Sequence, residues 1–160
     1  MTVTVAAATP RHIPAMLTLL NEMDQFYGGA TDGKSAERAE QLRQALFGDP
    51  PMAYALVAVD GDDLVGIASW SFLWPAVGLT RSLYLKELYV TRSRWRSGVG
   101  TLLMQAVFEV AAKNRCSRVE WTTDSDNPDA QEFYAGLGLQ QVPSKLFFRA
   151  DATVIERSLS

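Results

Sequence analysis

The sequence has very few of the residues that build disulfides and metal centres. It contains one cysteine, Cys116, and one histidine, His12, among 160 residues. A single cysteine cannot form an intrachain disulfide, and protein zinc sites draw most of their ligands from several cysteines and histidines. We therefore expect a fold held together by its hydrophobic core, and no metal ion at the functional site.

Long apolar runs and an excess of positive charge are also missing. No stretch reaches the roughly 20 apolar residues that a membrane-spanning helix needs, and residues 1–8 lack the basic and apolar segments of a secretory signal. The formal net charge is -3, whereas nucleic-acid-binding domains usually present a basic face. We expect neither a membrane nor a nucleic acid as partner, and a cytoplasmic location.

The composition that remains is that of an ordinary globular domain, 48% hydrophobic and 21% charged. A chain of this length buries roughly 70% of the surface that its unfolded form exposes, so it needs no cross-links. No repeat or low-complexity linker interrupts it. We expect one domain over residues 1–160.

Hydrophobic periodicity predicts alternating strands and helices. Cap-plus-proline pairs at Thr9-Pro10 and Asn127-Pro128 are typical of helix starts. In the strand predicted at 83–90, strict alternation places Leu83, Leu85, Glu87 and Tyr89 on one face. The predicted strands are 3–5, 53–59, 64–73, 83–90, 119–123 and 146–148, and the predicted helices begin near residues 10, 35, 98 and 127.

A glycine-containing loop at residues 94–100, Arg-Trp-Arg-Ser-Gly-Val-Gly, joins a predicted strand to a predicted helix. The first backbone N–H groups of a helix lack intrahelical partners and carry partial positive charge. Glycine allows an anion to approach them closely, and the two arginines add fixed charge. The loop suits a pyrophosphate, although a tight turn explains the glycines equally well. It matches neither a nucleotide P-loop nor a dinucleotide fingerprint.

A second block, at residues 127–138, reads as a capped helix. Asn127 is a good N-cap residue, Pro128 suits the first turn, and Phe133 and Leu137 form an apolar pair one turn apart. Folding alone explains these features. Tyr134, taken by itself, is better explained as a half-buried structural tyrosine.

Together the two blocks resemble the GNAT superfamily of acyl-CoA N-acyltransferases. The family's loop reads Arg/Gln-x-x-Gly-x-Gly/Ala, and its later helix often reads Asn-x-x-Ala-x-x-Phe-Tyr-x-x-x-Gly. The loop departs at Trp95, which takes the Arg/Gln position between two arginines. The helix pattern is complete in Asn127, Ala130, Phe133, Tyr134 and Gly138, and the similar stretch covers residues 83–139.

The resemblance implies an α/β (α+β) fold whose central sheet is mixed, mostly antiparallel and twisted. Six or seven strands and about four flanking helices are expected. It also implies that acetyl-CoA is the co-substrate, bound within residues 83–139. The residues implied to bind it are Leu88, Tyr89, Val90, Arg94, Arg96, Ser97, Gly98, Val99, Gly100, Thr101, Asn127 and Tyr134.

Residues 84–90 and 115–117 look like the diamine and polyamine acetyltransferase branch of this superfamily, which includes the spermidine/spermine acetyltransferases. That branch often carries two adjacent acids where this chain has Lys86-Glu87. The resemblance implies transfer of an acetyl group to a primary amine of a small molecule. Peptide, protein or aminoglycoside amines remain alternative acceptors, and a non-catalytic acyl-CoA-sensing module is an alternative of another class.

The implied reaction is direct attack of the amine on the thioester in a ternary complex. Glu87 is the candidate base, although an ordinary strand acid is an equal explanation. By resemblance, a backbone N–H within residues 88–90 stabilises the oxyanion, and Tyr134 protonates the leaving thiolate. Cys116 has no histidine placed to activate it and reads as a small apolar residue.

The acceptor pocket is expected beside the first helix and its loop. Asp24 and Tyr27 are candidates together with Glu87, and Trp70 and Trp74 are further candidates. The simplest explanation of Asp24 is nevertheless a solvated helix residue. Relatives are often dimers built through C-terminal strands. The apolar strand predicted at 146–148 therefore either joins two copies into a homodimer or completes the core.

Overall fold

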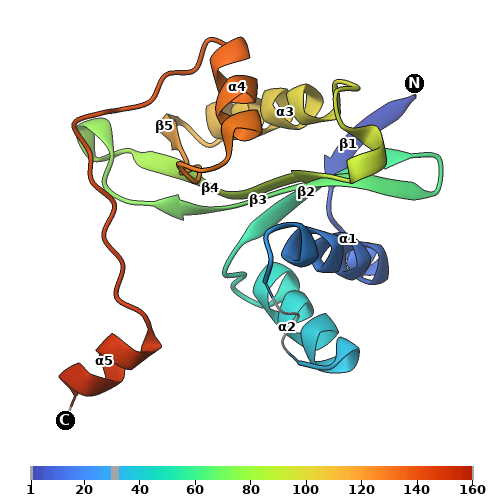
Figure 1. Cartoon of the computed structure of the whole chain (residues 1–160), viewed down its shortest axis with the longest axis horizontal. Coiled ribbons are helices and arrows are strands. Elements are labelled where there is room, and N and C mark those ends of the chain that lie inside the picture. The colour runs from blue at the N-terminus through green and yellow to red at the C-terminus, as the bar shows by residue number, and fades with distance from the viewer. Residues whose placement is uncertain (1, 30–32, 160) are drawn as a thin grey trace. The chain divides into compact units, whose positions relative to one another are not determined.

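The computed structural model describes residues 2–29 and 33–159 (Figure 1). The chain divides into two compact units, Met1–Thr122 and Thr123–Ser160, which are described separately below. Within the described ranges, every helix is too short or too polar to cross a membrane.

The first unit is built on a five-stranded sheet in the order β1-β2-β3-β4-β5. Neighbouring strands run antiparallel except β4 and β5, which are parallel. The mixed, mostly antiparallel α/β class is therefore confirmed, with five strands in the described residues where six or seven were predicted. The strands are β1 (Val3–Ala7), β2 (Tyr54–Asp60), β3 (Asp63–Leu73), β4 (Arg81–Val90) and β5 (Cys116–Glu120).

Three α-helices of the first unit lie on the two faces of this sheet. They are α1 (Ile13–Phe26), α2 (Ser35–Phe47) and α3 (Val99–Lys113). Figure 1 shows α1 and α2 on one face and α3 on the other. The predicted proline start is confirmed, because the short 3-10 turn η1 (Pro10–His12) leads directly into α1.

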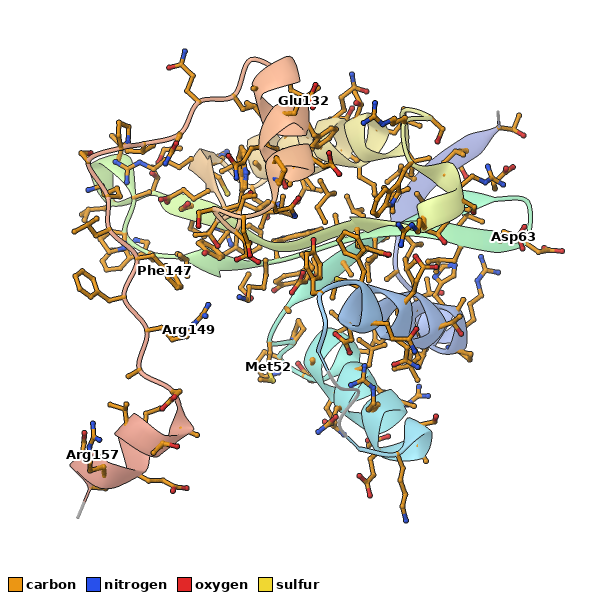
Figure 2. All side chains as sticks on the ribbon, viewed as in Figure 1. Met52, Asp63, Glu132, Phe147, Arg149 and Arg157 are labelled. Atoms are coloured by element: carbon orange, nitrogen blue, oxygen red, sulfur yellow. The ribbon has the colours of Figure 1, made fainter. Side chains whose placement is uncertain are left out.

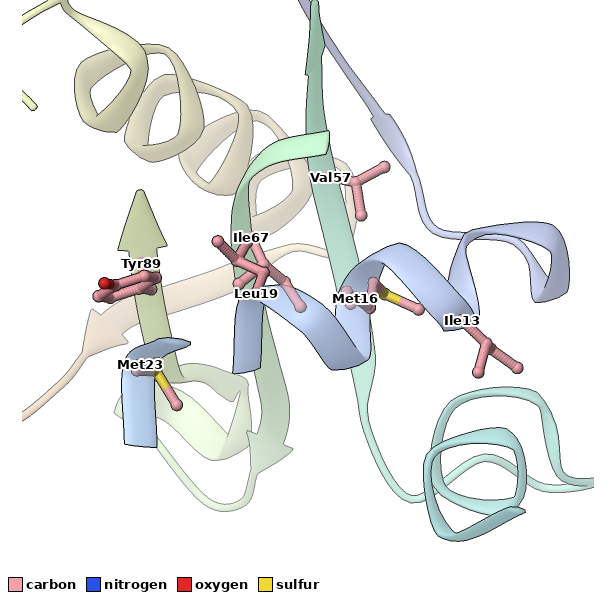
Figure 3. Packing of buried hydrophobic residues seen from close by; sticks show 8 residues of the cluster. Ile13, Met16, Leu19, Met23, Val57, Ile67 and Tyr89 are labelled. Atoms are coloured by element: carbon pink, nitrogen blue, oxygen red, sulfur yellow. The ribbon is translucent and has the colours of Figure 1, made fainter. Parts of the chain in front are cut away.

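The core beneath α1 combines one face of this helix with the three central strands. Its buried members are Ile13, Met16, Leu19, Met23, Ala55, Val57, Ile67 and Tyr89. Figure 3 shows α1 lying across the strands, with Leu19 against Ile67. Burial of this apolar surface is the main force that fixes α1 on the sheet.

On the opposite face, α3 packs closely against β3. Gly66 lies under the start of this helix, and a Cβ atom there would be 3.0 Å from Leu103 Cδ1 and 3.2 Å from Val99 Cγ1. The absence of a side chain at Gly66 therefore lets the first turn of α3 rest on the sheet. The parallel β4-α3-β5 unit agrees with the strand–helix–strand order that the sequence predicted.

A β-bulge in β4 overturns the predicted alternation of that strand. Ser69 pairs with Glu87 but Trp70 pairs with Leu85, so Lys86 is the extra residue. One extra residue reverses the phase of alternation. Leu85 therefore faces the same side as Trp70, whereas Glu87 and Tyr89 face the side covered by α1, and the prediction of one shared face was wrong.

The second unit contains α4 (Pro128–Gly136) and α5 (Ala152–Ser158), of which the sequence predicted only α4. The strand predicted at 146–148 was wrong, since the described residues 123–159 contain no strand. Leu146, Phe147 and Phe148 are 81%, 62% and 85% exposed. Figure 2 labels Phe147 in this segment, where the Arg149 guanidinium lies 4.9 Å from its ring. Apolar composition alone does not make a strand, because a strand also requires a hydrogen-bonding partner.

Candidate functional site

The first feature of the site is an open edge of β4. The pairing of β4 with β5 runs from Arg81 with Cys116 to Tyr84 with Glu120. Among the described strands, residues 85–90 pair with β3 only, so no strand lies along their other edge. Main-chain N–H and C=O groups along such an edge can bind an extended ligand as a further strand would. The predicted residues Leu88, Tyr89 and Val90 lie on it.

The second feature is the start of α3, which follows β4 after a short loop. Gly98 is the N-cap, with φ 90° and ψ 0°, and the space where its Cβ would lie is open to 4 Å. Leu102 N donates to Gly98 O at 3.1 Å, which is the first α-helical bond. The preceding N–H groups, at Val99, Gly100 and Thr101, have no acceptor within the helix and concentrate positive potential there. Because the Val99 side chain is buried, only its backbone can serve a ligand.

The two loop arginines differ in what they contact. Arg94 Nη1 lies 2.7 Å from Asp60 Oδ2, and both side chains are mostly buried. Arg96 is exposed, has φ 61°, and makes no ion pair with the described residues of the chain. The Ser97 hydroxyl donates to the Arg94 carbonyl. Arg94 and Ser97 therefore hold the loop, whereas the Arg96 side chain remains exposed.

Trp95 has a structural role at the position where the family pattern has Arg or Gln. Its indole N–H donates to Val90 O at 2.6 Å. Its ring meets Phe26 of α1 edge-on at 5.1 Å, and the Arg92 guanidinium lies 5.4 Å from it. The side chain thus joins the end of β4 to α1.

Glu22 of α1 is a central residue that the sequence analysis missed. Its Oε2 accepts hydrogen bonds from Tyr89 Oη at 2.6 Å and Arg92 N at 3.1 Å, and its Oε1 accepts from Thr91 Oγ1 at 2.8 Å. Burial raises the pKa of Glu22, but these hydrogen bonds and the Arg92 charge together lower it by more, so the pKa lies below its ordinary value. The pKa of Tyr89 is raised, by burial and by its bond to Glu22. Periodicity could not identify partners 67 to 70 positions away.

The predicted acceptor residues on α1 have different surroundings. Asp24 Oδ2 lies 3.2 Å from Arg38 Nη2, which also donates to Asn21 Oδ1, so Asp24 joins α2 to α1. Tyr27, which follows α1, is half-exposed, and its ring lies edge-on to Phe26 at 4.9 Å.

The remaining predicted residues of the first unit divide by exposure. Glu87 is half-buried beside the bulge. Trp70 is buried in the sheet and stacks on Tyr54 with ring centres 6.0 Å apart. Trp74 is exposed and donates to Leu79 O at 2.8 Å. Burial raises the pKa of the Cys116 thiol, which favours the unreactive protonated form.

Asn127 and Tyr134 belong to the second unit. The N-cap prediction is confirmed, because Asn127 Oδ1 accepts from Ala130 N at 3.2 Å. Tyr134 is half-buried, and its ring centre lies 5.2 Å from that of Phe133. The Tyr134 carbonyl accepts from Leu137 N and Leu139 N, and Gly138, with φ 77°, ends the helix.

The fold and the loop define an α/β protein in which an open strand edge leads to the glycine-capped start of a helix. The profile of the acetyltransferase (GNAT) family matches residues 16–139, and the chain belongs to that family. It is thus an acetyl-CoA-dependent N-acetyltransferase, as the two sequence blocks predicted.

Individual relatives agree with this assignment. Thialysine N-epsilon-acetyltransferase of Bos taurus is 27% identical over 135 residues, covering 79% of this chain and 78% of the relative. Spermidine/spermine N(1)-acetyltransferase-like protein 1 of Homo sapiens is 24% identical over 139 residues, covering 82% of this chain and 20% of the relative. The solved structure of an integron cassette protein from V. cholerae has a TM-score of 0.89 and 25% identity, covering 99% of this chain and 98% of that one.

Proposed function

We propose that the chain transfers the acetyl group of acetyl-CoA to a primary amine of a small molecule, by direct attack in a ternary complex. The observation that carries this proposal is the continuity of two binding features within one unit. The open edge at residues 85–90 leads through the loop to the N-terminus of α3 at Gly98. An extended chain ending in a pyrophosphate matches both features.

In this proposal the pantetheine arm of acetyl-CoA pairs with the main chain of Leu88 to Val90. The pyrophosphate lies against the N–H groups from Gly98 to Thr101, with Arg96 adding charge. The exposure of Arg96 and the open space at Gly98 support this arrangement. We assign an indirect role to three other predicted residues, because their side chains already contact the chain itself. Arg94 and Ser97 hold the loop, and Asn127 caps α4.

The reaction also needs a base for the amine, a donor for the oxyanion and an acid for the leaving thiolate. The acceptor ammonium, with a pKa of about 10, must lose a proton, and we assign Glu87 as the base, directly or through water. A β4 backbone N–H stabilises the oxyanion of the tetrahedral intermediate. Tyr134 donates its phenolic proton to the leaving thiolate, which has similar basicity, and the second proton that the acceptor nitrogen loses as the amide forms restores the phenol. We propose that residues 1–160 form a single N-acetyltransferase domain.

Chemistry shared by the substrates in the names of the relatives supports this acceptor class. Thialysine and spermidine both carry an unhindered primary amine, and the relatives are named for acetylating them. Glu87 beside the bulge and Tyr27 at the end of α1 offer polar groups for such an amine. Aminoglycosides and peptides are larger acceptors that the same chemistry would serve.

The test is acetyl-CoA-dependent thiol release, screened over amino-acid amines, diamines, polyamines, aminoglycosides and short peptides. Tyr134→Phe is the matched control, since it removes one hydroxyl. We expect turnover with a small primary amine, a kcat at least roughly 100-fold lower in Tyr134→Phe, and an unchanged dissociation constant for CoA. Full activity of Tyr134→Phe would remove Tyr134 from the acid role. Failure of the chain to bind CoA would refute the proposed function.

We further propose a homodimer that covers the C-terminal segment. Three consecutive large apolar side chains, Leu146 to Phe148, are exposed in the single chain, and such runs mark association surfaces. Light scattering after size exclusion should give twice the mass of one chain, and Phe148→Glu should reduce that mass. A monomer at every concentration would contradict the dimer.

A further inference from the structure

The carboxylate of Glu22 accepts three hydrogen bonds from a short stretch of chain at the end of β4. It accepts from the side chain of Tyr89 near the end of β4, from the side chain of Thr91 just after it, and from the main chain of Arg92 in η3 (Arg92–Arg94). Its two oxygens thus hold the turn that connects the open edge of β4 to the loop at residues 94–100. Each of these donors is supplied by a residue at least 67 positions away from Glu22.

The position of Glu22 is itself fixed by the core. The next residue, Met23, is buried in the cluster under α1, and Figure 3 shows Met23 and Tyr89 as neighbours. The backbone of α1 cannot shift without disturbing this packing. Glu22 is therefore a rigid acceptor for the loop rather than a mobile surface acid.

The hydrogen bond to Arg92 N extends this control further along the loop. Holding the main chain of Arg92 also orients its guanidinium, which lies 5.9 Å from the Phe26 ring and 5.4 Å from the Trp95 ring. Trp95 directly precedes Arg96 and is bonded to Val90. The geometry of the loop up to Arg96 thus depends on a residue outside the loop.

We propose that Glu22 is a positioning residue for CoA: through its hydrogen bonds to Tyr89, Thr91 and Arg92 it holds the loop in the shape that binds the pyrophosphate. This inference rests on the proposed function. Because α1 also leads to Tyr27, which the proposed function places beside the acceptor amine, one helix would support both the CoA side and the acceptor side of the site.

The test compares Glu22→Ala with Glu22→Gln. The alanine variant leaves three donors without an acceptor, whereas a glutamine carbonyl can accept from Tyr89 and Arg92 while its amide donates to the Thr91 hydroxyl. We expect Glu22→Ala to raise the calorimetric dissociation constant for CoA roughly ten-fold or more, and Glu22→Gln to stay within roughly three-fold of the unaltered chain. Glu109→Ala, at an exposed position of α3, is the control and should change nothing.

Kinetics distinguish positioning from general loss of structure. Glu22→Ala should raise KM for acetyl-CoA by a factor similar to the rise in dissociation constant, with kcat changed less than roughly three-fold. If Glu22→Ala does not fold, Tyr89→Phe and Thr91→Val each remove one donor. These two variants should weaken CoA binding less together than the sum of their separate effects, because they share one carboxylate.

Three results would overturn the inference. One is a Glu22→Ala variant, or the pair of partner variants, that binds CoA as tightly as the unaltered chain. Another is a Glu22→Gln variant as weak as Glu22→Ala, which would show that charge rather than hydrogen-bond geometry matters. Absence of CoA binding by the unaltered chain would instead refute the proposed function, and this inference with it.

Discussion

Trp95 donates its indole N–H to the carbonyl oxygen of Val90 at 2.6 Å, and this bond closes the turn between β4 and the loop at residues 94–100. The ring on the other side contacts Phe26 of α1. A residue that departs from the family's loop pattern is thus explained by its contacts with β4 and α1.

Replacing Trp95 by phenylalanine should lower the free energy of unfolding by about 1 kcal/mol, because it leaves the half-buried Val90 carbonyl without its donor while keeping an aromatic ring against Phe26. Urea denaturation measures the change. Trp74→Phe is the control, since that indole also donates to a carbonyl but is exposed, and its effect should be smaller. Equal effects of the two variants would contradict the anchoring role of Trp95.

Substituting valine for Gly98 should weaken CoA binding much more than the same change at Gly61. Both glycines have positive φ, 90° and 62°, and open space where a Cβ would lie. Each substitution forces a side chain into the left-handed region at a cost of roughly 1–3 kcal/mol, but only the one at Gly98 also fills the approach to the helix N-terminus. Calorimetry with CoA and thermal unfolding separate the two effects. Unchanged affinity in Gly98→Val would refute the loop assignment.

The two loop arginines should show opposite defects when replaced by alanine. Arg96→Ala should raise the dissociation constant for CoA roughly ten-fold through loss of a charge-assisted contact, with little change in unfolding. Arg94→Ala should lower stability first, since it leaves the carboxylate of Asp60 without its partner. A larger affinity loss in Arg94→Ala than in Arg96→Ala would reverse the proposed assignment.

Stability should depend on pH through Glu22. Its pKa is lower in the folded chain than the ordinary value of 4.5, because its hydrogen bonds and the Arg92 charge outweigh the effect of burial. A carboxyl with a depressed folded-state pKa stabilises the fold above its unfolded pKa, and this contribution is lost as the pH falls through the folded value.

The matching measurement is the difference in unfolding free energy between the unaltered chain and Glu22→Gln. This difference should be constant near pH 7 and should shrink as the pH falls below about 4.5. Glu109→Gln, at an exposed position, should give no such trend. A gap for Glu22→Gln that stays the same at pH 3 would show that the charge of Glu22 does not stabilise the fold.

Local chemistry made much of this protein predictable. Three helix starts were predicted correctly, because each depends on interactions within one turn of the chain. They are Asn127 for α4, Gly98 for α3 and Pro10 for η1. The strand–helix–strand order of β4, α3 and β5 was predicted for a related reason, since each element follows from its own hydrophobic period.

Non-local contacts explain the errors and omissions. Alternation predicted one face for Leu85 and Glu87, but the bulge at Lys86 exists only because β3 and β4 pair in a particular register. The strand predicted at 146–148 is absent for a similar reason. A strand needs a hydrogen-bonding partner strand, and among the described residues this segment has none.

The sequence by itself thus determined the class of the protein, because the loop and helix patterns are short, contiguous and chemically specific. Only the tertiary structure decided which residues of those patterns contact one another. It placed Arg94 on Asp60, left Arg96 exposed, and brought Glu22 to Tyr89, Thr91 and Arg92. The physical reason is that hydrogen bonds and ion pairs act over a few ångströms in space, and distance along the chain does not reveal which groups folding brings that close.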